Sequence, residues 1–480
     1  MNESLKSHIN GTYDVVVLGA GPVGQNVADH ARAAGLTVAV VECELVGGEC
    51  SYWACVPSKA LLRPVVAVAD TQRVDGARQA VTGRLDTDRV FARRNHYVSD
   101  WDDSGQAKWV RSIGADLFRG QGRIDGPRRV TVTRDDGASQ TLTARHAVAI
   151  ATGSRPMLPD IPGIEDVRPW TNRRGTDSST VPARLAIVGG GGVGVEMATL
   201  WQGVGSQVTL LARRPLLPRM EPFAGELIAR GLTQAGVDVR IGVEVTALRR
   251  PDSVTLTLDD GSELEADEVM FATGRAPHTD DIGLDTVGLT PGSWLDVDTT
   301  CLVRGVEGDW LYALGDVNHR ALLTHQGKYQ ARTAGDAIGA RAAGLPLDDA
   351  PWGDHATTAD QHAVPQVFFT DPEAGAVGLS AEEAGRAGHR TEVVDLDFNT
   401  AQGADLYADG YQGHARMVVD LDREVLLGVT FVGYGISELL HSATIAVAGE
   451  VPLKRLRHAV ACFPTVSEIW LFLLAAYHRK

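Results

Sequence analysis

The sequence predicts an α/β protein in which two related strand–helix–strand units are followed by a C-terminal α+β part. Three observations lead to this fold class. A β-branched run, a glycine-spaced turn and a helical stretch follow one another near the N-terminus, the same design returns in the middle of the chain, and alternating hydrophobic runs take over from about residue 346. The chain has 480 residues, which is too long for one ordinary hydrophobic core, so we expect several domains.

Composition and charge exclude several classes of protein. Hydrophobic residues make up 44% and charged residues 22% of the chain, as is typical of globular proteins. A formal net charge of −16 without a long basic run argues against a nucleic-acid partner. The polar N-terminal stretch lacks a signal-peptide core, the apolar run 469–477 is too short to span a bilayer, and five cysteines are too few for a disulfide scaffold. We therefore expect a cytoplasmic protein with no membrane partner.

The first glycine-rich unit predicts a nucleotide site. Residues 15–18 predict a buried parallel strand, the dozen residues after the turn predict a helix, and residues 37–41 predict a second strand that ends at Glu42. The turn carries the G-x-G-x-x-G spacing with Gly19, Gly21 and Gly24. In a dinucleotide-binding (Rossmann) unit such glycines let a pyrophosphate approach the helix N-terminus, and the acid accepts a hydrogen bond from a ribose hydroxyl. The alternative is a glycine-rich turn without a ligand.

The second unit repeats this design but lacks the acidic residue after its second strand. Its glycines are Gly189, Gly191 and Gly194, and residues 208–211 predict its second strand. Ala212 stands where an NAD-binding unit carries an acid, and Arg213, Arg214 and Arg219 follow. Arginines can hold a 2′-phosphate with paired donors, so we expect NADPH rather than NADH. The alternative is that these arginines lie on a solvated turn.

Three loops that follow predicted buried strands carry further candidate residues. Two contain Ala-Thr-Gly and one contains Leu-Gly-Asp; their candidate cofactor-binding residues are Thr152, Gly153, Gly274, Arg275, Gly315 and Asp316. Ligands of parallel sheets bind at the carboxyl ends of the strands, and an aspartate there can hold a sugar or ribityl hydroxyl.

A cysteine pair lies in the stretch GGECSYWACVPSK directly after the first unit. Cys50 and Cys55 are separated by four residues, and a helix is predicted from about Pro57. A thiol near a helix N-terminus has its thiolate stabilised, and only the thiolate is a nucleophile. A redox-active pair is the favoured interpretation. The alternatives are a zinc site, which lacks further ligands nearby, and two unpaired structural cysteines.

Taken in order, these motifs resemble the flavoprotein family of pyridine nucleotide-disulfide oxidoreductases, which includes dihydrolipoamide dehydrogenase, glutathione reductase and mercuric reductase. The C-terminal stretches FTDPEAGAVGLS and FPTVSE extend the resemblance over nearly the whole chain. It implies FAD on the first unit, NADPH on the second, and a homodimer. The implied domains are an FAD-binding domain of residues 1–155 and 271–345, an NADPH-binding domain of residues 156–270, and a C-terminal interface domain of residues 346–480.

The resemblance also implies roles for individual residues. Cys50 would meet the substrate, and Cys55 would lie against the flavin. Lys59 and Glu196 match an ion pair that lies beside the flavin and the nicotinamide. The glycines of both units, together with Glu42, Gly48, Arg275 and Asp316, match cofactor-contacting positions. The stretch from Ala212 to Arg219 resembles the NADPH-specific members of the family.

One position departs from the family pattern. The family carries His-Pro-Thr near the C-terminus with a glutamate five positions after the histidine, and this acid–base pair moves the thiol proton. Here the matching residues are Phe463 and Glu468, and phenylalanine cannot carry a proton. A phenylalanine there resembles 2-ketopropyl-coenzyme M oxidoreductase/carboxylase, although that member does not keep the glutamate. Other candidates for a replacement base are His441, His458 and Cys462.

The functional hypothesis follows from the resemblance. Electrons pass from NADPH through FAD to the cysteine pair and on to a disulfide-type or atypical small-molecule acceptor. The alternatives are a reductive carbon–carbon cleaving carboxylase, a quinone reductase that acts directly at the flavin, and a redox-sensing protein with little turnover. Mercuric reduction is less favoured because the family's extra C-terminal cysteines are missing.

Overall fold

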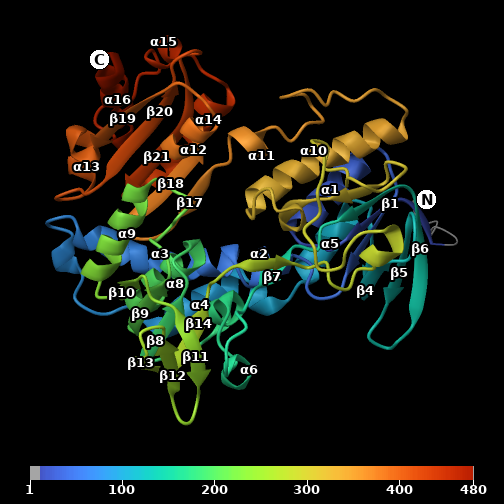
Figure 1. The fold of residues 1–480 in the computed structure, drawn as a ribbon, viewed down its shortest axis with the longest axis horizontal. Helices are drawn as coiled ribbons and strands as arrows, with labels where there is room; N and C mark the ends of the chain where they lie inside the picture. Colours follow the sequence, from blue (N-terminus) through green and yellow to red (C-terminus); the bar gives the residue numbers. More distant parts are fainter. Residues whose placement is uncertain (1–10, 479–480) are drawn as a thin grey trace. The chain divides into compact units, whose positions relative to one another are not determined.

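The computed structural model describes residues 11–478, which divide into two compact units (Figure 1). Unit 1 combines the chain up to Val56 with Asn95–Arg155 and Arg275–Gln361, and unit 2 combines Pro57–Arg94, Pro156–Gly274 and the chain from His362 onward. Within residues 11–478, no helix has the length and apolar character needed to cross a membrane. The division into three domains expected from the sequence stays a prediction.

The sheet of unit 1 contains the first glycine-rich unit. Its strand order is β3-β2-β1-β6-β5-β4, with β16 paired to β6. Strands β3, β2, β1, β6 and β16 pair in parallel, whereas β6, β5 and β4 pair antiparallel. The strands are β1 (Thr12–Leu18), β2 (Val38–Glu42), β3 (Asp116–Arg119), β4 (Gln121–Ile124), β5 (Arg129–Thr133), β6 (Ser139–Ile150) and β16 (Leu311–Ala313). The valines of β1 are buried, as expected for a parallel strand covered on both faces.

Helices α1 and α10 lie side by side against this sheet (Figure 1). Helix α1 starts directly after the glycine turn with Pro22, whose fixed φ suits the first helical position. The helices of unit 1 include α1 (Pro22–Ala33), α2 (Gly48–Tyr52), α5 (Ser104–Ser112) and α10 (Thr324–Ala342). Helix α3 (Cys55–Gln72) begins three residues after α2 and carries the second cysteine as its first residue.

Unit 2 contains the second glycine-rich unit in a parallel sheet of order β10-β9-β8-β14. Its elements are β8 (Arg184–Val188), α8 (Gly192–Gly203), β9 (Gln207–Ala212), α9 (Pro222–Gln234), β10 (Asp238–Ile241) and β14 (Glu268–Phe271). An antiparallel meander of β11 (Val245–Arg249), β12 (Val254–Leu258) and β13 (Glu263–Ala266) precedes β14. Short helices α6 (Ile164–Val167) and α7 (Asn172–Asp177) precede β8.

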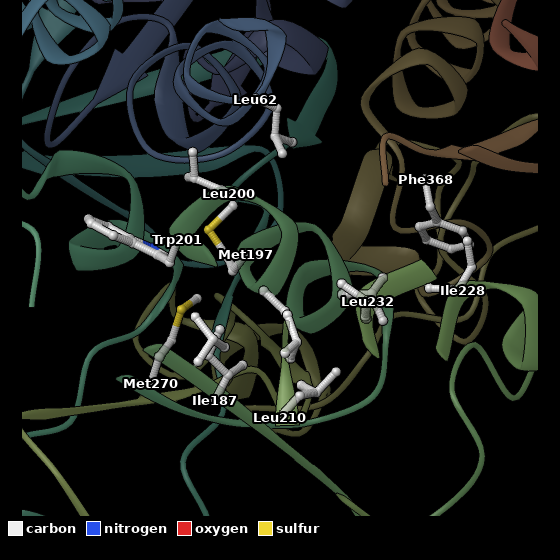
Figure 2. Packing of buried hydrophobic residues seen from close by; sticks show 14 of the residues in the cluster. Leu62, Ile187, Met197, Leu200, Trp201, Leu210, Ile228, Leu232, Met270 and Phe368 are labelled. Carbon is white, nitrogen blue, oxygen red and sulfur yellow. The ribbon is translucent and has the colours of Figure 1, made fainter. Parts of the chain in front are cut away.

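A large apolar cluster holds unit 2 together (Figure 2). It joins Leu62 of α3, Met197 and Trp201 of α8, Met270 of β14 and Phe368 near the C-terminal sheet. All five side chains are less than 10% exposed. Because burial of one large apolar side chain contributes roughly 2 kcal/mol, this cluster fixes the position of α8, which carries the second glycine turn.

The C-terminal part of unit 2 is an antiparallel sheet of order β17-β18-β21-β20-β19, with α14 packed on β18 and β21 (Figure 1). Its strands are β17 (Gln366–Phe368), β18 (Glu373–Gly378), β19 (Thr391–Asp397), β20 (His414–Asp420) and β21 (Val425–Gly433). Its helices include α12 (Ala381–Arg386), α13 (Gln402–Tyr407), α14 (Ile436–Ala448), α15 (Leu453–Leu456) and α16 (Ile469–His478). The alternating hydrophobic runs expected from the sequence therefore form strands of this sheet.

Candidate functional site

The first glycine turn is a cradle in which two of the three glycines leave no room for a side chain. Gly19 has φ +95°, and a Cβ there would lie 2.5 Å from the carbonyl oxygen of Ala151. A Cβ on Gly24 would lie 1.9 Å from the carbonyl oxygen of Gly19. Around Gly21, in contrast, a Cβ would meet nothing within 4 Å, so the N-terminus of α1 opens onto space. This geometry fits the pyrophosphate of a dinucleotide, which the helix N-terminus attracts.

Glu42 is fixed at the end of β2, beside this cradle. Its Oε2 accepts the N–H of Ala20 at 2.7 Å and its Oε1 accepts the N–H of Glu44 at 2.8 Å. Burial raises the pKa of Glu42, and the two N–H donors and Arg119 act against this. Each carboxylate oxygen retains a second acceptor site, so Glu42 fits a ribose hydroxyl donor.

The second glycine turn repeats the first one in unit 2. A Cβ on Gly189 would lie 2.4 Å from the carbonyl oxygen of Ala272, and one on Gly194 would lie 1.8 Å from that of Gly189. Gly191 again faces open space. In both units the first glycine therefore lies against the Ala-Thr-Gly turn that follows the neighbouring strand, and the second unit fits a second dinucleotide.

The arginines after β9 are exposed at the end of this second unit. Arg213 contacts Glu244 at 3.4 Å, while its side chain is 66% exposed. Arg219 is exposed and takes part in no ion pair with any residue in 11–478. Ala212, the last residue of β9, is buried. No carboxylate therefore stands at the position where an acid would repel a 2′-phosphate.

Arg275, Ser154 and Asp316 form one polar cluster in unit 1. The Nε of Arg275 donates to Ser154 Oγ at 2.6 Å, and Ser154 Oγ donates to Asp316 Oδ2. Burial raises the pKa of Asp316, which the Ser154 hydrogen bond and the Arg275 charge partly offset. Thr152 donates to the carbonyl of His278 at 2.7 Å and holds the adjoining turn. Ser154 was not identified from the sequence, although it directly follows the first Ala-Thr-Gly turn.

The Gly315–Asp316 turn is supported from α10. Gln330 accepts the Gly315 N–H at 2.7 Å and the Asn318 side-chain N–H at 2.8 Å. Its own Nε2 donates to the buried carboxylate of Asp360 at 2.9 Å. These bonds fix the turn that carries the candidate ribityl contact. Sequence reasoning missed Gln330 because nothing in a lone glutamine identifies its distant partner.

The cysteine stretch packs against the first glycine turn. The Gly47 N–H donates to the carbonyl of Ala20 at 2.9 Å, and a Cβ on Gly48 would lie 3.0 Å from the Cα of Gly21. Cys50 follows in α2, and Cys55 is the first residue of α3. Both cysteines belong to unit 1 together with the first cradle.

The two cysteines interact with each other and with two residues of α10. They are present as thiols, and each is partly exposed. The pKa of Cys50 is raised, first by its hydrogen bond with Cys55 and then by burial. Thr324 and the charge of Lys328, both on α10, lower it in part. The Thr324 hydroxyl also lies 3.2 Å from Cys55 Sγ. Sequence reasoning missed Thr324 and Lys328. A signal was present, because the two residues are four positions apart at the start of the helix that follows the Gly315–Asp316 turn.

Lys59 and Glu196 form an ion pair within unit 2. The two side chains are joined by a 2.6 Å contact between Nζ and Oε2, and the Glu196 side chain is 9% exposed. Its other oxygen accepts the Phe369 N–H at 2.9 Å. The catalytic role that the resemblance gives this pair stays a prediction.

Phe463 is 75% exposed and joined to Pro464 by a cis peptide bond. Glu468 is buried and accepts the N–H groups of Gly403 and Thr465 at 2.9 and 3.3 Å. The replacement bases considered from the sequence are all exposed: His441, His458 and Cys462.

Among the residues of 11–478, no group of three or more His, Cys, Asp or Glu side chains is arranged to hold a metal ion.

Comparison with family models gives two matches. The model described as "Pyridine nucleotide-disulphide oxidoreductase" matches residues 13–337. The model of the dimerisation domain of the same family matches residues 364–471. The two matches cover most of the chain and confirm the resemblance and the fold class.

Relatives and solved structures agree with this. The chain is 30% identical to a dihydrolipoyl dehydrogenase of Thermus scotoductus over 98% of both chains. It is 31% identical to dihydrolipoyl dehydrogenase 3 of Pseudomonas aeruginosa over 94% of this chain and 95% of that protein. It is 29% identical to a mercuric reductase of Staphylococcus aureus over 96% of this chain and 81% of that protein. The fold matches the flavoprotein disulfide reductase RclA of Escherichia coli with a TM-score of 0.81 at 23% identity, over 97% of this chain and 99% of the other.

Proposed function

The chain belongs to the pyridine nucleotide-disulphide oxidoreductase family, and on this premise we propose that it is an FAD-dependent NADPH oxidoreductase that reduces a disulfide-type acceptor through Cys50 and Cys55. One observation carries the proposal. The two thiols hydrogen-bond to each other in the same compact unit as the first dinucleotide cradle. Two thiols that share a hydrogen bond can form a disulfide between them, and the pair can then alternate between dithiol and disulfide.

The residues of unit 1 fit FAD. The open N-terminus of α1 suits the pyrophosphate, Glu42 suits the ribose, and Asp316, held by Ser154 and Arg275, suits the ribityl chain. Bound FAD supplies the two-electron carrier chemistry that links a nicotinamide with a disulfide. The protein residues would contribute binding and orientation through the turns around Gly19 and Gly315, which packing and hydrogen bonds hold in place.

The thiol chemistry is a balanced exchange. The Cys50 thiolate attacks one sulfur of the acceptor disulfide, so a Cys50–acceptor disulfide forms and the first acceptor thiolate leaves. The Cys55 thiolate then attacks Cys50 Sγ, restores the internal disulfide and expels the second acceptor thiolate. Each leaving thiolate takes up a proton that one of the two cysteines released to solvent. The acceptor gains two electrons, and the cysteine pair loses two.

The nucleotide preference and the assembly are parts of the same proposal. Exposed arginines and the alanine at the end of β9 support NADPH as the donor, since a carboxylate there would repel the 2′-phosphate. The match to a dimerisation domain over residues 364–471 supports a homodimer. We place the protein in the cytoplasm because disulfide exchange driven by NADPH suits a reducing compartment.

A reductive carbon–carbon cleaving carboxylase is the second candidate. Phe463 favours it, because a phenylalanine near the reacting carbon excludes a proton donor and leaves a carbanion for carbon dioxide. The retained Glu468 does not favour it specifically, since its carboxylate accepts two backbone N–H groups.

Reductive titration of the purified flavoprotein tests the proposal. With dithionite under argon, the wild-type protein should take up two electrons at the flavin and two more at the cysteine pair. The Cys50→Ser and Cys55→Ser variants should each take up only the first two. A wild-type protein that stops after two electrons would remove the cysteine pair from the mechanism. NADPH consumption with a panel of disulfides, ketones (with and without bicarbonate) and quinones then separates the candidate acceptors.

A further inference from the structure

The start of α10 faces the cysteine pair. Thr324 is the first residue of this helix, and its hydroxyl lies 3.2 Å from Cys55 Sγ. Lys328 comes four residues later, and side chains four apart share one face of a helix. Lys328 therefore lies on the face that α10 turns toward the two sulfur atoms. Cys50, Cys55 and α10 all belong to unit 1.

The charge of Lys328 is not neutralised by a carboxylate. Its side chain is half-buried, and none of the ion pairs within residues 11–478 involves it. Lys59 provides a contrast, because its ammonium group contacts Glu196 at 2.6 Å. The ammonium group of Lys328 is therefore available to an anion that forms nearby.

We propose that Lys328 is the cation that stabilises the Cys50 thiolate, in a chain that carries Phe463 at the sequence position of the family's histidine. This inference rests on the proposed function, in which Cys50 is the thiol that attacks the acceptor. Lys328 acts by its charge and not as a proton relay. The family's imidazole, in contrast, takes the proton from the thiol and returns it.

The other ionisable groups around Cys50 act differently. Cys55 shares a hydrogen bond with Cys50 and raises its pKa. Glu49 precedes Cys50 in α2, and a carboxylate also disfavours a neighbouring thiolate. His325 follows Thr324 in α10 and is exposed. Lys328 is thus the group near Cys50 whose permanent charge favours the thiolate.

The test is the alkylation rate of Cys50 in the dithionite-reduced holoenzyme, followed by peptide mass mapping with iodoacetamide between about pH 6 and pH 10. At pH 7, Lys328→Gln and Lys328→Met should each slow alkylation about tenfold, because a nearby opposite charge lowers a pKa by about one unit or more. Lys328→Arg should restore the rate to within about twofold because it keeps the charge. The matched control is Arg332→Gln, an exposed cation one turn further along α10, which should leave the rate unchanged. Visible flavin absorbance and thermal melting verify that each variant is folded.

Three results would overturn the assignment. One is an alkylation rate of Cys50 in Lys328→Gln and Lys328→Met that equals the wild-type rate. Another is an alkylation rate in Arg332→Gln that falls as much as in the Lys328 variants. The third is an inflection near about pH 6.5 that His325→Gln abolishes, since the imidazole would then set the reactivity. If Lys328→Gln does not fold, the comparison of Lys328→Met and Lys328→Arg decides. Failure of the proposed function is distinguishable, because it appears as a two-electron endpoint in the dithionite titration, whatever the alkylation rates are.

Discussion

The carboxylate of Glu468 accepts the backbone N–H of Gly403 at 2.9 Å. Gly403 also packs closely against Thr465, because a Cβ on Gly403 would lie 2.1 Å from the carbonyl carbon of Thr465. Glu468 also caps its own turn through the Thr465 N–H. The sequence left Glu468 without its usual imidazole partner, and the structure shows that the glutamate has a structural use that does not need one.

Restoring the histidine should restore the proton relay. In Phe463→His, the imidazole stands five positions before Glu468, whose second oxygen is available to orient it. We expect turnover with small disulfides to rise at least about tenfold, because a positioned acid–base contributes about 10²–10⁴-fold. Steady-state NADPH oxidation measures this. The double variant Phe463→His/Glu468→Gln serves as the control and should lose most of the gain; an unchanged rate in Phe463→His would show that the missing base does not limit turnover.

The rate of disulfide reduction by the wild-type protein should increase steadily with pH. The pKa of Cys50 is raised by its hydrogen bond with Cys55 and by burial, so the neutral thiol predominates below that pKa. The thiolate fraction then grows about tenfold per pH unit, and disulfide reduction should accelerate steadily from about pH 6 to pH 9. Stopped-flow oxidation of the reduced enzyme measures this rate. A bell-shaped profile centred near neutrality would contradict the expectation.

A substitution in one glycine turn should abolish the binding of one cofactor and leave the binding of the other unchanged. Gly24→Ala places a methyl group 1.9 Å from the Gly19 carbonyl oxygen, so the protein should be isolated without flavin. Gly194→Ala creates the same clash at 1.8 Å in unit 2, so the protein should keep its flavin and lose NADPH binding. Flavin absorbance and NADPH fluorescence titration separate the two defects. Gly105→Ala and Gly385→Ala are matched controls, since neither Cβ meets an atom within 4 Å.

The arginines after β9 should set the nucleotide preference. Replacing Arg213 and Arg219 by alanine removes donors for a 2′-phosphate but leaves the glycine turn intact. We expect the KM for NADPH to rise about tenfold or more with little change for NADH, since each charge-assisted hydrogen bond contributes about 1.5 kcal/mol. Ala212→Glu should reverse the preference by repelling the phosphate. A wild-type enzyme that prefers NADH would refute the arginine interpretation.

An ion pair between Arg416 and Glu221 should stabilise unit 2. The two groups meet at 2.8 Å, the Glu221 side chain is 3% exposed, and Arg416 also contacts Asp395 of the adjacent strand. Arg416→Met leaves Glu221 as an unpaired buried charge, which costs about 3 kcal/mol or more. The melting temperature should fall by several degrees, while Arg249→Met, whose partner Glu263 is 51% exposed, should change it less. Equal melting temperatures for the two variants would contradict the buried-charge argument.

Much of the fold was predictable because its signals are local. The run at residues 15–18 lies in β1, the helix predicted after the first glycines is α1, and the second unit repeats this pattern in β8, α8 and β9. The glycine spacing could be interpreted because the same steric rule applies in each turn: Gly24 leaves no room for a Cβ against the Gly19 carbonyl. Strands β4, β5, β11 and β13 were not anticipated, because these half-buried strands carry weaker hydrophobic patterns.

The sequence by itself determined the two cradles, the cysteine pair and the loss of the histidine at Phe463, since each is a matter of residue type and short spacing. Only the tertiary structure decided what surrounds them. Ser154 lies between Arg275 and Asp316, which are both more than a hundred positions away from it in the chain. Lys328, on the face of α10 turned toward the cysteines, is likewise more than a hundred positions away from Cys50. The physical reason is that electrostatic and hydrogen-bond partners are set by distance in space, and local patterns carry no information about which distant side chain will arrive there.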